Sequence, residues 1–343
     1  MNSTQLKDIQ NFAKTFQLFA EFTNASFLIT GATGLIGSSL VHCLLALHKR
    51  IKITCPVRNI DKAYTMYGKE ATRINFIECE LLDFLANLSV DNKFDYIVHC
   101  ASPTVSSYIL DHPVETYTLA IDTTRAILEY AHNSGIKGFV YVSSLEVYGQ
   151  ILDDRIITED MQGYVDITSP RSSYPLGKRA AEYLCTAYAK EYGVAAKIAR
   201  LTQTFGAGVA ADDNRVFAQF ARSVIAGTDI VLHTAGESAK PYCYTTDCIS
   251  AILYILLKGQ NGAAYNVANE DTYISIKTMA EFLRNKFNTQ IDVRVELHPE
   301  MGYAPVTKLH LSAKKLMALG WKPKYGLKEM YTKLINSMTE SYG

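Results

Sequence analysis

The chain has 343 residues, enough for one large domain or two modest domains with a sizeable hydrophobic core. Its 34 basic and 34 acidic side chains leave no net charge, which argues against a nucleic acid or an anionic membrane as partner. The 7 cysteines include no Cys-x-x-Cys pair and predict reduced thiols and a cytoplasmic location, and the 8 histidines form no ligand pattern, so no metal is expected.

Residues 1–24 precede the first predicted strand and lack the basic start and continuous apolar core of a signal peptide. Apolar side chains recur there at helical spacing, at Leu6, Ile9, Phe12, Phe16 and Phe19. This pattern predicts an amphipathic helix that packs on the body of the protein, with a partner-binding helix as the alternative. No apolar run in the chain reaches the roughly eighteen residues of a membrane span, so no membrane partner is expected.

A short apolar strand, Ala25–Thr30, leads directly into a glycine-rich turn and then an apolar helix that runs to about Leu47. Glycines permit a tight turn, close approach of backbone amides to a pyrophosphate, and close packing of the helix on the strand. The spacing is GxxGxxG rather than the GxGxxG of many dehydrogenases. The turn predicts a dinucleotide site formed by Gly31, Thr33, Gly34, Leu35, Ile36 and Gly37.

Strands and helices alternate along the chain after this unit. The candidate strands are Ile51–Val57, Ile74–Cys79, Tyr96–Cys100, Phe139–Ser143 and Ala196–Ala199, with long helices over Val114–Ser134 and Tyr174–Tyr192. This order predicts an α/β fold with a Rossmann-type, doubly wound parallel sheet. We expect a cofactor-binding domain over residues 25–205 that carries the catalytic residues. Residues 206–343, with a helix near Val216–Ala226, are expected to be mainly a smaller substrate-binding domain.

Tyr174 and Lys178 are four residues apart and therefore share one face of their predicted helix. An ammonium next to a phenol favours the phenolate, so Lys178 is expected to lower the pKa of Tyr174 and make it a usable acid or base. Ser144, at the end of the preceding strand, is placed to hold the substrate oxygen. With a hydride carrier nearby, the three side chains predict interconversion of a hydroxyl and a carbonyl group.

These motifs resemble those of the extended short-chain dehydrogenase/reductases, the nucleotide-sugar epimerase/dehydratase group. The resemblance covers about Phe27 to Pro323 and rests on TGATGLIG at 30–37, HCASP at 99–103, VSSLEVYG at 142–149, YPLGK at 174–178, RLTQTFGAG at 200–208, DNRVFAQF at 213–220 and LGWKP at 319–323. Locally the chain is similar to UDP-glucuronate decarboxylases and dTDP-glucose 4,6-dehydratases. The resemblance implies a nucleotide-diphosphate sugar as substrate, a role in polysaccharide biosynthesis, and a homodimer formed through the two long helices.

The resemblance also extends the cofactor site beyond the glycine turn, to Glu80, Leu81, Ala101 and Ser102. Glu80 matches the family's acidic residue near the adenine amino group. The second strand is followed by Arg58 and not by the acidic residue that usually holds the adenosine ribose. An arginine suits a 2′-phosphate, so NADP is favoured over NAD, with an ordinary exposed arginine at a strand end as the alternative.

The substrate contacts that the resemblance implies are Ser102, Ser144, Gln203, Arg215, His233 and Lys240. Arg215 matches a family arginine that meets the nucleotide diphosphate, and His233 lies in the segment under the base. Lys240 stands where relatives have arginine. Lysine keeps the positive charge but loses the bidentate fork that suits a carboxylate.

In relatives the two residues after the catalytic serine or threonine largely decide the chemistry. They resemble Asp-Glu in dehydratases and Ser-Glu in decarboxylases, whereas here Ser144 is followed by Leu145 and Glu146. Leucine cannot transfer a proton, which disfavours simple dehydration and, together with Lys240, decarboxylation. Glu146 could act as a base next to a carbonyl, or only orient water or Lys178.

Three functions remain open from the sequence. The first is an epimerase or modified dehydratase that retains its NAD(P) through an internal redox cycle. The second is a net NADPH-dependent reductase that converts a nucleotide-linked keto sugar or a ketose to an alcohol. The third is a non-catalytic Rossmann cofactor sensor, against which the intact set of Ser144, Tyr174 and Lys178 argues.

Overall fold

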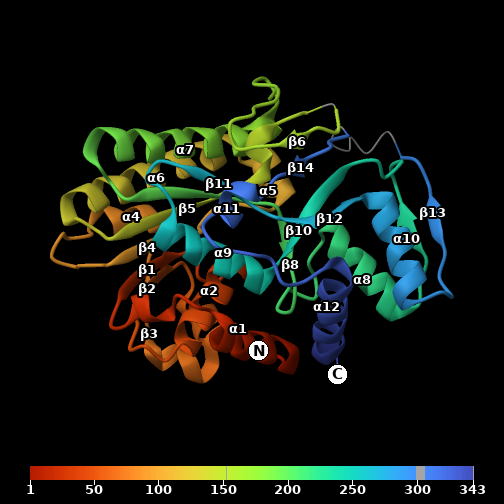
Figure 1. Cartoon of the computed structure of the whole chain (residues 1–343), viewed down its shortest axis with the longest axis horizontal. Coiled ribbons are helices and arrows are strands. Elements are labelled where there is room, and N and C mark those ends of the chain that lie inside the picture. The colour runs from red at the N-terminus through yellow and green to blue at the C-terminus, as the bar shows by residue number, and fades with distance from the viewer. Residues whose placement is uncertain (152, 299–305, 343) are drawn as a thin grey trace.

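The centre of the computed structural model, which describes residues 1–151, 153–298 and 306–342, is a seven-stranded parallel sheet (Figure 1). Its strands are β1 (Ser26–Thr30), β2 (Lys52–Val57), β3 (Ile74–Glu78), β4 (Tyr96–His99), β5 (Gly138–Ser144), β7 (Ala196–Leu201) and β11 (Ala264–Val267). They run in the order β11-β7-β5-β4-β1-β2-β3. The doubly wound Rossmann sheet expected from the sequence is confirmed.

Helices cover both faces of this sheet, because strands of a parallel sheet are buried on both sides. One face carries α1 (Ser3–Thr15), α2 (Leu35–Ala46) and α9 (Thr245–Lys258), and the other carries α4 (Leu81–Ala86), α6 (Pro113–Ser134) and α7 (Ser173–Tyr192) (Figure 1). Strand β5 contributes to both cores by alternation: Val140 and Val142 face the first group of helices, and Phe139 and Tyr141 face the second.

The chain reverses its direction of progress across the sheet at β1. Strands β2 and β3 follow on one side of β1, and β4, β5, β7 and β11 lie on the other. At such a switch point the connections leave the carboxyl ends of neighbouring strands in opposite directions, and a crevice opens between them. The residues that follow β1, β4 and β5 therefore meet at one edge of the sheet.

A second group of elements builds its own core at the right of Figure 1. It contains α8 (Val216–Ala226), α10 (Ile276–Phe287), α12 (Leu327–Tyr342), β8 (Gln203–Phe205), β9 (Ile230–Leu232), β10 (Ala239–Tyr244), β12 (Asn269–Ser275) and β13 (Val293–Val295). Helix α9 and strand β11 come after residue 205 but pack on or join the large sheet. The chain thus returns to the first layer before it ends, and a division at residue 205 stays a prediction.

Short elements complete the described chain. They are α3 (Ile60–Tyr67), α5 (Ser106–Asp111), α11 (Lys314–Met317), the two-residue strands β6 (Ile156–Ile157) and β14 (His310–Leu311), and the 3-10 turns η1 (Phe19–Phe22), η2 (Gly68–Arg73), η3 (Leu145–Tyr148) and η4 (Pro170–Ser172). Within the described ranges, no helix combines the length and the apolar character needed to cross a membrane.

The N-terminal segment forms helix α1, and its apolar side packs against the protein. Ile9, Phe12 and Phe16 are buried, whereas Leu6 and Phe19 stay exposed. The ring of Phe16 stacks on Phe12 with centroids 5.1 Å apart and meets the edge of another ring in α9. Of the two expectations for this helix, packing on the body of the protein agrees with these contacts.

Helix α1 also connects the two groups of elements through a buried carboxylate. Asp8 accepts hydrogen bonds from the Tyr244 hydroxyl of β10 and, at 2.6 Å, from the Lys333 ammonium of α12. Since Asp8 is buried, these partners compensate for the loss of its hydration. The N-terminal helix packs on the Rossmann layer and is therefore also bonded to β10 and α12 of the second group.

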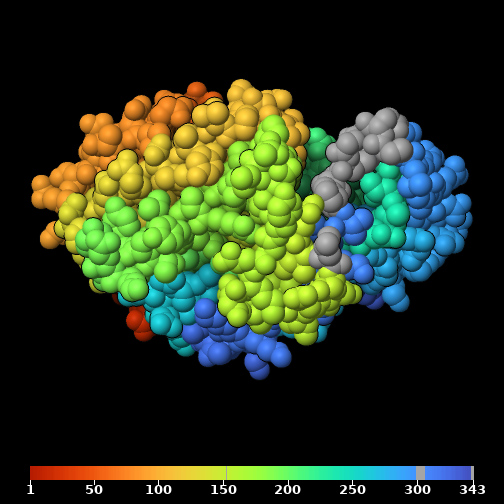
Figure 2. Space-filling model, turned by 90° about the horizontal axis from the view of Figure 1, so that it is seen from above, coloured from red at the N-terminus to blue at the C-terminus, as the bar shows by residue number. Residues whose placement is uncertain are grey.

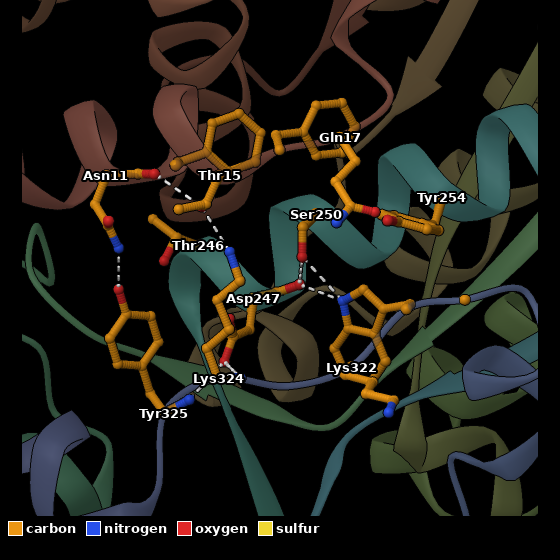
Figure 3. A pocket seen from close by; sticks show the side chains of 14 residues that line it. Asn11, Thr15, Gln17, Thr246, Asp247, Ser250, Tyr254, Lys322, Lys324 and Tyr325 are labelled. Atoms are coloured by element: carbon orange, nitrogen blue, oxygen red, sulfur yellow. Dashed lines mark hydrogen bonds between the residues drawn. The ribbon is translucent and has the colours of Figure 1, made fainter.

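A cavity of about 220 Å³ lies between α1, α9 and the segment 320–325 (Figure 3). Polar bonds cross it: Asn11 donates to the Tyr325 hydroxyl at 2.9 Å, and the Lys324 ammonium donates to the Thr15 hydroxyl at 2.6 Å. The Asp247 carboxylate at its wall accepts the backbone amides of residues 324 and 325. None of the candidate catalytic residues lines this cavity.

The buried Asp247 carboxyl is expected to make the free energy of unfolding depend on pH. Burial raises the pKa of its carboxyl to about 6, although the amides of Lys324 and Tyr325 act in the lowering direction. A carboxyl with a raised folded-state pKa contributes stability that is present at low pH and lost as pH rises through about 6. Asp247→Asn keeps an oxygen for the amides and removes this loss.

Between pH 5 and pH 8 the wild type is expected to lose about 1 kcal/mol of unfolding free energy relative to Asp247→Asn. Denaturant unfolding of both proteins across this range measures the difference, in which the other titrating groups cancel. A difference that is flat with pH, or that grows in favour of the wild type, contradicts the prediction.

Candidate functional site

The glycine turn after β1 is shaped by two close backbone approaches. Gly31 has φ +70°, and a Cβ there would lie 2.7 Å from the backbone nitrogen of Ala101. A Cβ on Gly37 would lie 2.2 Å from the carbonyl oxygen of Gly31, whereas one on Gly34 would meet its nearest atom at 3.5 Å. Gly31 and Gly37 thus let β1, α2 and the segment after β4 approach one another, and the N-terminal amides of α2 receive no side-chain cap.

Gly37→Ala is therefore expected to destabilise the protein by about 1–3 kcal/mol, because the added methyl group collides with backbone that cannot rotate away. Gly34→Ala is the matched control, since its methyl group meets only an ordinary contact distance and its φ of −90° suits any residue. Thermal unfolding of the two variants measures the contrast. Equal losses in both would show that the close approach at Gly37 is not what demands glycine.

A buried histidine supports the same turn from the neighbouring strand. His99 of β4 bonds the Thr30 hydroxyl at 2.6 Å and the Thr123 hydroxyl at 3.1 Å. Burial, with a smaller contribution from Lys178, lowers the pKa of His99 to about 3, so the ring is neutral. The Thr30 hydroxyl also accepts the backbone amide of Ala101 at 3.2 Å, and this bond fixes the segment that carries Ser102.

The residues expected near the adenosine follow the carboxyl ends of β2 and β3, at the β3 edge of the sheet. Arg58 follows β2, Glu80 directly precedes α4, and both side chains are exposed. The pKa of Tyr108 in α5 is raised mainly by its hydrogen bond to Glu115, and Arg58 and Glu80 act on it in opposite directions. Tyr108, which had no role in the sequence analysis, therefore borders this edge.

Tyr174 and Lys178 project from the first turns of α7 and are both buried. The Lys178 ammonium donates to the carbonyl oxygen of Val142 in β5 at 2.9 Å, and it lies 4.7 Å from the ring centroid of Tyr141 and 5.7 Å from that of Tyr174. Ser144 ends β5 and caps η3 by accepting the backbone amide of Glu146 at 3.2 Å. The structure thus brings the three predicted side chains to one place.

The expectation that the pKa of Tyr174 is lowered is wrong: the pKa of this phenol is raised. Burial raises the pKa of the phenol above its ordinary range, Glu146 raises it further, and the Ser144 hydroxyl and Arg171 lower it by smaller amounts. Lys178 is itself desolvated, and burial lowers the pKa of its ammonium to about 8. Spacing on a helix shows which groups are neighbours, but it does not show how far both are removed from water.

Glu146 does not stand alone in the site. Its two carboxylate oxygens accept from the Arg171 Nη2 group of η4 at 3.3 and 3.2 Å. Burial lowers the pKa of the Lys240 ammonium in β10, and Glu146 and Arg171 act on it in opposite directions. A carboxylate and two cations therefore lie close to one another near Tyr174, and Arg171 was not among the residues expected from the sequence.

Leu145 points away from this group of charges. Its side chain is 6% exposed and belongs to a small apolar core with Val147, Tyr148 and other residues near β6 and β14. The side chain between Ser144 and Glu146 is therefore part of this apolar core. It contributes no proton donor to the site, as the sequence indicated.

The remaining expected substrate residues lie on three elements of the second group. Gln203 is half-buried at the start of β8, which pairs with β10 beside Tyr242. Arg215 precedes α8, where its guanidinium bonds Asp213 at 3.0 Å and lies 4.8 Å from the ring centroid of Phe217. His233 is exposed, with its ring 5.2 Å from that of His298.

A buried polar network next to Ser144 was not predicted from the sequence. Arg200 of β7 bonds the Glu182 carboxylate of α7, with Nη2 2.7 Å from Oε2. The same carboxylate accepts the Ser143 hydroxyl at 2.5 Å, and Arg200 also donates to the Tyr148 hydroxyl at 3.0 Å. Because these residues come from β5, β7, η3 and α7, the network fixes the strand that ends in Ser144 relative to the helix that carries Tyr174.

Comparisons with known proteins agree on one family. A model of the NAD dependent epimerase/dehydratase family matches residues 27–268. The chain is 27% identical over 309 residues to UDP-glucuronic acid decarboxylase 6 of Arabidopsis thaliana, covering 90% of this chain and 87% of the relative. An epimerase structure from Methanothermobacter thermautotrophicus aligns with a TM-score of 0.80 at 20% identity, covering 97% of this chain and 96% of that one.

The UDP-glucose 4-epimerase structure of Thermotoga maritima aligns with a TM-score of 0.79 at 18% identity, covering 93% of this chain and 100% of that one. These alignments establish a common fold. The family match spans more than half of the chain and includes the glycine turn, Ser144, Tyr174 and Lys178. The resemblance drawn from the motifs is thus confirmed at the level of the family. The chain is an enzyme that belongs to the NAD-dependent epimerase/dehydratase family.

Proposed function

We propose that the protein transfers hydride between a nicotinamide cofactor and a hydroxyl or ketone carbon of a nucleotide-activated sugar. The observation that carries this proposal is the meeting of Tyr174, Lys178 and Ser144 at the carboxyl edge of the sheet. Two of the three proteins compared above bear the names of enzymes of UDP-linked sugars, which supports this substrate class.

The residues around the crevice suit a dinucleotide. Gly31 and Gly37 let backbone groups come close together, and the uncapped amides at the start of α2 suit a phosphate. Lys178 uses one of its three N–H groups on the carbonyl of Val142 and has others for further acceptors. A bound nicotinamide cofactor supplies or accepts the hydride.

The proton is moved by the protein's own side chains. Ser144 holds the substrate oxygen, and the ionised Tyr174 oxygen takes the hydroxyl proton as the carbon–oxygen bond becomes a carbonyl. In the opposite direction the neutral phenol returns the proton to the carbonyl oxygen. Glu146 lies within electrostatic reach of Tyr174.

A panel of nucleotides and nucleotide sugars carrying UDP, CDP, GDP or dTDP tests the substrate class. One nucleotide is expected to raise the melting temperature well above the others, and its sugars are then assayed for hydride transfer at the nicotinamide absorbance band. If no nucleotide sugar binds or reacts, the proposed substrate class fails.

A net reductase is the second candidate, and Leu145 together with Arg58 favours it. Leu145 supplies no acid for elimination, and an exposed Arg58 suits a cofactor that dissociates after each turnover. Incubation with NADPH and keto-sugar nucleotides separates the candidates. Stoichiometric loss of NADPH supports the reductase, whereas tightly bound oxidised cofactor without net NADPH turnover supports the internal redox cycle of an epimerase.

NADP is proposed as the preferred cofactor because of Arg58. Its guanidinium is exposed at the end of β2, and among the described residues it makes no hydrogen bond or ion pair, so it has donors for a 2′-phosphate. Titration of the protein with NADP and with NAD measures the preference. Equal or tighter binding of NAD removes this role for Arg58.

A homodimer through α6 and α7 is proposed as the assembly. The two helices lie side by side on the face seen in Figure 2, and their outer surface carries Val114, Tyr117 and Tyr183, which are 76%, 40% and 71% exposed. A second copy would bury these apolar groups. Sedimentation at micromolar concentration that finds only the monomer contradicts the proposal.

A further inference from the structure

The ion pair between Glu146 and Arg171 lies within electrostatic reach of Tyr174, the proposed proton-transfer group. We propose that Arg171 is a positioning residue that holds Glu146 in a neutral pair, so that this carboxylate neither takes the substrate proton nor opposes the ionisation of Tyr174. The inference deepens the proposed function and rests on it.

A single nitrogen of Arg171 makes both hydrogen bonds of the ion pair. One nitrogen of Arg171, Nη2, lies between both oxygens of Glu146 at 3.3 and 3.2 Å, and Nη1 is directed to the Ser106 hydroxyl of α5 at 3.4 Å. The two side chains are 36% and 38% exposed, so the pair borders solvent-accessible space. A carboxylate whose two oxygens share one donor has a fixed orientation but keeps lone pairs for other partners.

Arg171 is fixed to the catalytic tyrosine by the chain itself. It lies three residues before Tyr174, in the turn η4 that continues directly into α7. Glu146 lies two residues after Ser144, in the turn η3 that follows β5. The ion pair therefore joins the two elements that carry the proposed proton-transfer group and the oxygen-holding serine.

Opposite charges in the pair act on Tyr174 in opposite directions. Glu146 raises the pKa of the phenol and Arg171 lowers it, while burial gives the largest shift, upward. The other charged or titratable groups near this point include Lys178 and Glu182 on the same helix, Tyr141 of β5 and Lys240 of β10. Glu182 acts on Lys178 and Tyr141 and is paired with Arg200, whereas Glu146 is the carboxylate that acts on Tyr174 itself. The Glu146 carboxylate is therefore the anion that most opposes the phenolate, and Arg171 is its partner.

The charges that each substitution removes predict a different pH dependence of turnover for the two single variants and the double variant. In the oxidative direction, turnover needs the phenolate, so it falls as pH decreases below the pKa of Tyr174, which burial raises. Arg171→Gln leaves Glu146 unpaired, so this acidic limb is expected to move up by about one pH unit. Glu146→Gln removes the opposing charge and moves the limb down, and the double variant replaces one neutral pair by another and returns it close to the wild type.

The experiment is the pH dependence of kcat for hydride transfer with the nucleotide sugar selected by the panel above. Arg171→Lys keeps the charge and is expected to leave the limb near the wild-type position. Arg155→Gln is the matched control, because Arg155 forms an exposed ion pair with Asp153 elsewhere. Opposite shifts in the two single variants and recovery in the double variant support the inference.

A purely structural role for Arg171 gives a different result. Arg171→Gln would then lower kcat or the melting temperature without moving the limb, and the double variant would not recover; either finding overturns the inference. Failure of the proposed function is distinguishable, since it shows as absent turnover in the wild type or as full turnover in Tyr174→Phe.

Discussion

Replacing Tyr174 by phenylalanine is expected to lower turnover by about a hundredfold to ten-thousandfold, the usual contribution of a positioned acid or base. The change deletes one hydroxyl from a side chain that is 9% exposed, and the ring remains to fill the same space. Cofactor binding should therefore persist. Steady-state hydride transfer measures the loss of turnover, and thermal shift with NAD(P) measures the retained binding.

Tyr192→Phe provides the control for this experiment. Tyr192 lies at the end of the same helix and is 49% exposed, so the loss of its hydroxyl is expected to leave turnover within a factor of two of the wild type. Unchanged activity in Tyr174→Phe would instead show that the Tyr174 hydroxyl is not the group that transfers the proton. Equal losses in both variants would point to a general effect on α7.

Replacing Arg200 by methionine is expected to cost about 3–5 kcal/mol of unfolding free energy, because it leaves a buried carboxylate without its partner. The side chains of Arg200 and Glu182 are 13% and 8% exposed, and their closest atoms are 2.7 Å apart. The hydrogen bond that Ser143 donates to Glu182 is too weak to compensate for the loss of Arg200 next to this buried carboxylate. Denaturant unfolding of the variant and the wild type measures the loss.

Two variants separate the buried pair from a general effect of losing an arginine. Arg125→Met breaks an exposed pair with Glu129, whose side chains are 53% and 49% exposed, and should cost less than about 1 kcal/mol. Replacing Arg200 and Glu182 together by methionine removes both charges and should recover a large part of the stability. A loss in Arg200→Met no greater than that in Arg125→Met would contradict the prediction.

Local sequence patterns were sufficient for the sheet and for finding the three side chains, Ser144, Tyr174 and Lys178, that the structure brings together. A glycine turn, or two residues four apart on a helix, is defined within a few residues, so no tertiary information is needed. The helix expected over 216–226 has those bounds in the structure, and the helix expected from Tyr174 begins one residue earlier, at Ser173. The strand expected to end at Ala199 continues to Leu201, because pairing with β5 and β11 extends it.

The partners of the site residues depend on irregular segments that no periodicity describes. Glu146 and Arg171 are 25 residues apart, and the described residues between them form only one short strand, turns and irregular segments. Arg200 stood in a quoted motif, yet its burial against Glu182 follows from the crossing of β7 and α7. The direction of the Tyr174 pKa was missed for the same reason, since burial is a property of the assembled fold.

Strand β11 has a consequence for how the chain reaches its native state. The parallel sheet ends on a strand from residues 264–267, and one of its faces needs α9 from residues 245–258. During synthesis, β7 would therefore present an unpaired edge until about sixty further residues had emerged, a condition that favours association with other chains. Fragments that stop near residue 205 should accordingly aggregate, and the complete enzyme should fold slowly through contacts between distant parts of the chain.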